Sequence, residues 1–308
     1  MKKFNVSLKA FLAASSILFA GPAIAQDAES VPTAEKEATL SDTAAPALWK
    51  VADEDTTIYL FGTIHALPTD IEWSTPTLKN ALAASDSIVT EIKMGPGIEQ
   101  EMQGLVMSKG ILPQGTTLRS LLSEEQTASY EEAMGKLSIP AAAFDQFEPW
   151  YAGMMMSMLP LLQQGYSPDA GVEKVLLTMV GDKEQQALET IAFQIGVFDE
   201  LPQDSQIGFL IDAAEGIDEI KPMLDKMVAE WVEGDADALA TLMNEGLTDP
   251  AVAESLLYMR NRNWADWIDT RLDAPGTVFI AVGAGHLAGK QSVQDYLAER
   301  EIEAVRVQ

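Results

Sequence analysis

The feature that most constrains the fold is a short motif that occurs twice, near opposite ends of the chain. The apolar run 57–60 is followed by Gly62-Thr63-Ile64-His65, and the apolar run 277–280 by Gly283-Ala284-Gly285-His286, so the motifs hold both histidines of the sequence. Short apolar runs of this kind predict buried strands, and glycine at a strand end lets the backbone turn sharply or approach a ligand. We therefore expect the two ends of the chain to share one sheet, with both histidines at its carboxyl edge, where open α/β sheets place their ligands.

Further apolar runs predict the rest of this sheet. With the two motif strands, the expected strands are 48–51, 57–61, 86–92, 186–190, 277–282 and 303–307. Asp53-Glu54-Asp55 between the first two predicts a hairpin turn. Helices are expected at 75–84 and 288–300, and the second would join the last two strands in a βαβ unit, which makes the sheet partly parallel.

The middle of the chain is predicted to be helical. The expected helices are 123–137, 147–164, 169–180, 204–216, 217–234, 235–246 and 250–272. The predicted fold class is therefore α/β, with a mixed β-sheet built from both ends of the chain and a large helical middle region. We expect a single domain over residues 46–308, carrying a helical insert at about 97–272.

The N-terminal residues predict export from the cytoplasm. Lys2 and Lys3 precede the apolar run 11–24, and Ala23-Ile24-Ala25 matches a signal-peptidase site, so residues 1–25 read as a signal peptide. Residues 26–45 are rich in Ala, Glu, Thr, Asp and Pro, which predicts a disordered tether. We expect a periplasmic or secreted protein with no membrane span after signal cleavage.

Composition excludes several kinds of site and partner. The chain has no cysteine, which rules out disulfides, thiolate metal sites and thiol nucleophiles. Its formal net charge is −27 at pH 7, and such a surface repels nucleic acid. No nucleic-acid partner is expected, and nothing in the sequence indicates the oligomeric state.

The paired histidines suggest a metal site that a carboxylate would complete. Two imidazoles alone hold a metal weakly, and neutral imidazole is a common metal ligand. Glu91 ends the expected strand 86–92 and Glu189 closes the run 186–190, so either could lie at the same sheet edge. Imidazole and carboxylate donors without sulfur suit Mn²⁺, Co²⁺, Fe²⁺ or Zn²⁺.

The sequence resembles the TraB/GumN family, to which PrgY and the Tiki proteases also belong. The resemblance runs over the whole expected folded chain, from Leu48 to Val307. The matching segments are Leu48-Trp49-Lys50-Val51, Tyr59 to Pro68, Glu91, Leu188-Glu189-Thr190 with Gln194, Phe198 to Pro202 with Gln206, Arg260-Asn261 with Trp264-Ala265, and Val282 to Leu287.

Membership of this family would imply a metal-dependent active site. By position, His65 and His286 become metal ligands or acid/base groups, and Glu91 becomes a ligand or general base, with Glu189 as the alternative carboxylate. Arg260 becomes a candidate to hold a substrate carboxylate or to stabilise an oxyanion. The Tiki proteases imply hydrolysis of a peptide or peptide-like substrate through a metal-activated water.

Two other functions remain open from the sequence. The same histidines could hold a peptide or haem in a binding or sequestering protein that performs no catalysis. Alternatively, the helical middle could be an interaction module beside a vestigial site.

Overall fold

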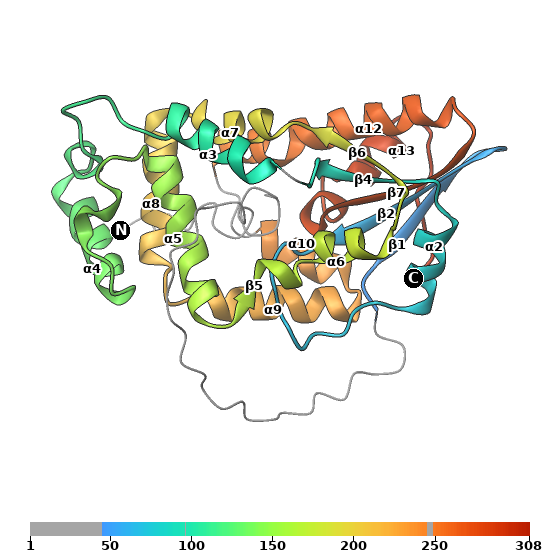
Figure 1. The fold of residues 1–308 in the computed structure, drawn as a ribbon, viewed down its shortest axis with the longest axis horizontal. Coiled ribbons are helices and arrows are strands. Elements are labelled where there is room, and N and C mark those ends of the chain that lie inside the picture. The colour runs from blue at the N-terminus through green and yellow to red at the C-terminus, as the bar shows by residue number, and fades with distance from the viewer. Residues whose placement is uncertain (1–44, 96, 245–248) are drawn as a thin grey trace.

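The computed structural model describes residues 45–95, 97–244 and 249–308. The expected signal peptide and the expected tether up to residue 44 lie outside these residues. Within them the chain is mixed α/β, and the predicted fold class is confirmed: a six-stranded mixed sheet takes strands from both ends of the chain, and helices dominate between them (Figure 1).

The main sheet has the strand order β6-β4-β7-β2-β1-β8, and a second small sheet pairs β3 with β5. Their bounds are β1 (Leu48–Ala52), β2 (Thr56–Thr63), β3 (Leu67–Pro68), β4 (Ser87–Ile92), β5 (Tyr166–Ser167), β6 (Glu184–Glu189), β7 (Gly276–Gly283) and β8 (Val305–Arg306). Strands β6, β4, β7 and β2 run parallel to one another, whereas β1 is antiparallel to both β2 and β8. All six predicted strands therefore belong to the main sheet.

Helices cover the sheet and form a lobe at one end of it, seen at the left of Figure 1. The α-helices are α2 (Pro76–Ala84), α3 (Ile98–Lys109), α4 (Glu124–Lys136), α5 (Pro149–Gln163), α6 (Val172–Met179), α7 (Ile191–Asp199), α8 (Gln203–Glu215), α9 (Ile220–Glu233), α10 (Ala236–Asn244), α11 (Pro250–Ala253), α12 (Met259–Leu272) and α13 (Val293–Ala298). The shorter helices are η2 (Leu118–Leu121), η3 (Ala141–Phe144), η4 (Pro168–Ala170), η6 (Ala284–Leu287) and the π-helical turn η5 (Glu254–Tyr258).

Successive side chains of the central strands point to opposite faces of the sheet and so belong to two separate hydrophobic cores. Ile58 and Leu60 of β2 join the core under α12 and α13, while Phe61 joins the larger core on the other face. In β7, Val278 and Ile280 likewise join the core under α12 and α13, whereas the residue between them and the one directly after them join the larger core. Both faces of these strands are buried, as expected for parallel strands covered by helices on each side.

The sequence misjudged some helices. The expected helix 288–300 begins only at Val293, because Gly289 and Gln291 have positive φ values that no helix accommodates. Helices α3 and α7 were not predicted. The expected helix 250–272 is a continuous helical segment that contains the π-turn η5. Part of the expected helix 235–246, beyond Asn244, lies outside the described residues.

No helix in the described ranges is long and apolar enough to cross a membrane.

One hydrogen bond ties a covering helix to the first motif. The indole Nε1 of Trp231, in α9, donates to the carbonyl oxygen of Gly62 over 2.8 Å, and the indole is buried. A buried hydrogen bond of this kind contributes about 1 kcal/mol to stability.

We predict that Trp231→Phe lowers the free energy of unfolding by about 1–2 kcal/mol, because the ring is retained and the hydrogen bond is lost. Urea unfolding followed by circular dichroism measures this. Trp267→Phe, at a partly buried position, is the control and should change the free energy by less than about 0.5 kcal/mol. Equal losses in the two variants would contradict the role of the bond.

Candidate functional site

The two Gly-x-x-His motifs lie next to each other at one edge of the main sheet. Strands β2 and β7 are parallel, and their register pairs Thr63 with Gly283 at the ends of both strands. Gly62 allows the close approach: a Cβ at this position would lie 3.0 Å from the Cα of Ala284 in η6. The sequence prediction that both motifs meet at one strand edge is therefore confirmed.

His65 is held by a carboxylate through one ring nitrogen. Its Nδ1 lies 2.5 Å from Oε1 of Glu173, and its Nε2 is buried and has no hydrogen-bond partner among the described residues. Burial by itself lowers the pKa of His65. The charge and hydrogen bond of Glu173 and the charge of Glu91 raise this pKa by more than burial lowers it, so it lies above the ordinary value. The unpartnered nitrogen is the atom that could meet a ligand.

Close backbone packing brings Glu173 to His65. The N–H of Val172 donates to the carbonyl oxygen of Ile64 over 3.0 Å, so α6 begins against the first motif. A Cβ on Gly171 would lie 2.1 Å from the carbonyl oxygen of His65, which leaves room for glycine alone. The β3–β5 ladder fixes the same two segments just beyond the site. The hydroxyl of Thr63 also donates to Oε1 of Glu173 and orients the carboxylate.

Glu91, at the end of β4, is an ionised carboxylate held by three donors. Oε1 accepts a hydrogen bond from the N–H of Gly283 at 2.7 Å. Oε2 accepts from Nη2 of Arg260 at 2.6 Å and from Nε2 of Gln194 at 2.8 Å. Burial raises the pKa of Glu91, but Arg260, then His286 and His65, and the Gly283 N–H lower it to about 2. These groups stabilise the ionised form of Glu91 far more than its protonated form.

Arg260 joins the two candidate carboxylates. Its Nε and Nη2 donate to Oε1 and Oε2 of Glu189 at 2.8 and 2.9 Å, a bidentate pair, while Nη2 also reaches Glu91. Trp264 donates from its indole to Oε1 of Glu189 over 2.8 Å. The Nη1 of Arg260 donates to the carbonyl oxygen of Leu256 in the π-turn, a type of turn that often marks functional sites. Arg260 is fully buried, so its contacts favour anchoring of the two carboxylates over contact with a substrate.

The imidazole of His286 is held by the side-chain amide of Asn261, whose own orientation is set by a second hydrogen bond. Its Nδ1 lies 2.6 Å from Oδ1 of Asn261, and Nδ2 of Asn261 donates to the carbonyl oxygen of Gln291 at 2.7 Å. Because the amide oxygen must accept, the proton of a neutral His286 sits on Nδ1. The ring packs on Trp264 with 4.2 Å between centroids.

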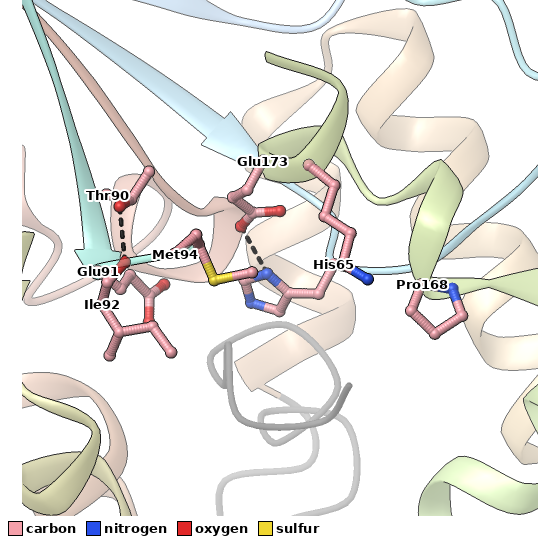
Figure 2. Close-up of a pocket in the computed structure, with 8 residues that line it drawn as sticks. His65, Thr90, Glu91, Ile92, Met94, Pro168 and Glu173 are labelled. Carbon is pink, nitrogen blue, oxygen red and sulfur yellow. Dashed lines mark hydrogen bonds and ion pairs between the residues drawn. The ribbon is translucent and has the colours of Figure 1, made fainter. Parts of the chain in front are cut away.

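A small cavity connects His65 with the buried carboxylates. It measures about 30 Å³, and Figure 2 shows its lining, including His65, Glu91, Ile92, Met94 and Glu173. This volume admits a water molecule or a metal ion without its hydration shell, but not a peptide. Of the two carboxylates left open by the sequence, Glu91 lines this cavity, whereas Glu189 lies behind Arg260.

The chemical types of the side chains at the site suit a divalent cation, but their distances from one another do not. His65 and His286 each engage an oxygen through Nδ1, the arrangement that usually orients a metal-binding imidazole. Nitrogen and carboxylate donors without sulfur also match such a cation. However, in the part of the chain that the structure describes, no three His, Cys, Asp or Glu side chains gather closely enough to hold a metal ion.

Glu173 is the site residue that sequence reasoning missed. It lies at the second position of α6, within the predicted helix 169–180, and no spacing from either histidine marked it. The glycine before that helix was the available signal, since a helix that begins at glycine can approach another backbone closely. Asn261 and Gln194 had been noted beside Arg260 and Glu189, but not as partners of His286 and Glu91.

Comparison with known proteins identifies a family over nearly all of the described chain. The model of the TraB/PrgY/gumN family matches residues 47–306. Neither a curated protein nor a solved structure matches.

We predict that Glu91→Gln lowers the free energy of unfolding by about 3–5 kcal/mol at pH 7, because the neutral amide leaves Arg260 incompletely paired. The folded-state pKa of Glu91, about 2, lies below its ordinary value of 4.5. Its stabilisation is therefore complete above pH 4.5 and is lost as the pH falls toward 2. The difference in free energy of unfolding between the wild-type protein and Glu91→Gln should therefore decrease by about 2 kcal/mol between pH 7 and pH 3.

Urea unfolding at pH 7, 5 and 3 measures this gap. Glu131→Gln, which removes an exposed carboxylate paired with Arg119, is the control and should leave the curves nearly unchanged. A gap that stays constant with pH would show that Glu91 is not held ionised by Arg260.

We also predict that Gly171→Ala displaces α6, separates Glu173 from His65 and costs about 1–3 kcal/mol of stability. Thermal unfolding and the His65 ring resonances in NMR spectra measure the two effects. The control, Gly104→Ala in α3, meets no atom within 4 Å and should stabilise the helix or leave it unchanged. An unshifted His65 resonance in Gly171→Ala would contradict the packing argument.

Proposed function

The chain belongs to the TraB/PrgY/gumN family, and on that premise we propose that it is a metal-dependent hydrolase acting on peptides or peptide-like substrates. The proposal includes action outside the cytoplasm, in the periplasm or after secretion, because of the signal-peptide pattern in residues 1–25.

The observation that carries the proposal is the state of His65. A buried polar atom without a partner costs free energy. Within the described ranges Nε2 of His65 is such an atom, and it lies at the wall of a cavity that Glu91 also lines. Its other nitrogen is held by Glu173. A cation bound at Nε2 would satisfy that atom and use the orientation that Glu173 imposes.

Buried charge supports the same proposal. Two carboxyl groups, those of Glu91 and Glu189, share the guanidinium of Arg260, and all three side chains are buried. Carboxylates in excess of their cationic partners are costly in a protein interior. A divalent cation beside His65 would offset this excess.

The residues then divide into ligands and supports. His65, His286 and Glu91 are the proposed ligands of Mn²⁺, Co²⁺, Fe²⁺ or Zn²⁺. Such a cation, when bound, supplies a Lewis acid that lowers the pKa of a water molecule. Glu173 and Asn261 orient the two imidazoles. Arg260 holds Glu91 ionised, and Glu189 holds Arg260 in place.

One observation favours a second candidate function. With a pKa of about 2 and three hydrogen-bond donors, Glu91 is a weak base, so it is poorly suited to accept a proton from water. A protein that binds or sequesters a peptide or haem through the same histidines needs no base. Turnover distinguishes this candidate from a hydrolase.

The test is metal titration of the purified exported protein with Mn²⁺, Co²⁺ and Zn²⁺ by calorimetry, followed by assays with internally quenched peptide libraries. We predict stoichiometric binding that the His65→Ala/His286→Ala double variant loses, and peptide hydrolysis that depends on the added metal. Glu131→Gln, far from the histidines, should retain both.

Metal binding without hydrolysis of any peptide would favour the binding protein. No metal binding by the wild-type protein would remove the metal-dependent hydrolase from consideration.

A further inference from the structure

A second and larger cavity adjoins the cavity at His65. It measures about 460 Å³, within the range of small-ligand sites, and is formed by the end of β4, by α3 and by α6. The two cavities have Ile92, Met94 and Lys174 in common, so each of these side chains borders both. Figure 2 shows Ile92 and Met94 in the lining beside Glu91 and His65. A molecule that fills the larger cavity therefore lies directly beside the proposed reaction site.

The walls of this cavity are mainly apolar. Ile98 of α3 and Val175 and Leu177 of α6 line it, and each is a partly buried side chain packed against the main core. The part of each side chain that is not buried in the core faces this cavity. Filling the cavity with apolar atoms removes this surface from water, which is the main driving force for binding apolar groups.

The charged residues of the lining disfavour an acidic ligand. Glu99 and Asp169 both line the cavity. The ammonium group of Lys174 is 2.9 Å from Oδ1 of Asp169, so its charge is already paired. An acidic side chain would meet two carboxylates and one paired cation, and would lose its hydration against apolar walls.

We propose that this cavity, which we call the α3–α6 pocket, binds a large apolar side chain of the peptide substrate, in the residue next to the cleaved bond. The proposal rests on the proposed function, because it assigns the substrate class of that same site. The small cavity at His65 holds the reacting groups, and the α3–α6 pocket selects Leu, Phe, Ile or Met over acidic residues.

Leu177→Trp tests the proposal by filling the pocket. Its matched control is Met179→Trp, on the same helix, at an exposed position that does not line the cavity. For quenched peptides with Leu or Phe beside the cleaved bond, we expect Leu177→Trp to raise KM at least about tenfold. Peptides with Ala at that position should be less affected, and Met179→Trp should match the wild type for both.

Binding is measured separately from turnover. Fluorescence anisotropy of two labelled peptides, identical except for Leu or Glu at the test position, should show tighter binding of the Leu peptide to the wild-type protein. Leu177→Trp should remove that difference. If hydrolysis is absent but the Leu preference is present, the proposed function fails and the pocket assignment stands.

The opposite result is equally distinct. Hydrolysis with no preference between Leu and Glu, or equal behaviour of Leu177→Trp and Met179→Trp, would overturn the pocket assignment and leave the hydrolase intact. Should Leu177→Trp fail to fold by circular dichroism, Ile98→Trp replaces it. The matched control is then Met107→Trp, at an exposed position on the same helix.

Discussion

The buried contact of Arg260 with Glu91 and Glu189 determines how the sheet edge and its covering helix fit together. The guanidinium comes from α12, and the two carboxylates come from the ends of the adjacent strands β4 and β6. The N–H of Gly283, at the end of β7, also donates to Glu91. A single cluster thus connects three neighbouring strands and one helix. Because a buried charge without a partner is very costly, any arrangement that separates these groups is strongly disfavoured.

The same cluster controls the electrostatics of both histidines. Glu91 remains ionised beside them, and its charge helps to raise the pKa of His65 above the ordinary value. Two carboxylates and one guanidinium leave the cluster with an excess of negative charge. We propose that this excess favours a cation next to Nε2 of His65, which has no hydrogen-bond partner in the described part of the chain. The proposed metal centre is thus a consequence of the ion cluster as much as of the histidines.

In the proposed function, reaction and recognition would take place in two adjoining cavities. The small cavity presents polar atoms that are each oriented by a second residue, and its size excludes a substrate side chain. The α3–α6 pocket presents apolar walls and paired charges. Helix α6 contributes to both, because Glu173 near its start supports His65 and Leu177 near its end lines the pocket. A shift of this helix would therefore change both the orientation of His65 and the shape of the pocket.

Sequence alone determined the elements that depend on local pattern and on pairing of the chain ends. Short apolar runs identified all six strands of the main sheet, and the repeated motif brought His65 and His286 to one edge, because parallel neighbours end together. Strand-end acids likewise indicated Glu91 and Glu189. Only the tertiary structure decided that Glu91 lines the cavity, that Arg260 is an internal partner of both acids, and that Glu173 supports His65. These depend on contacts between residues more than 70 positions apart, and no local periodicity records the packing of a helix against a distant strand.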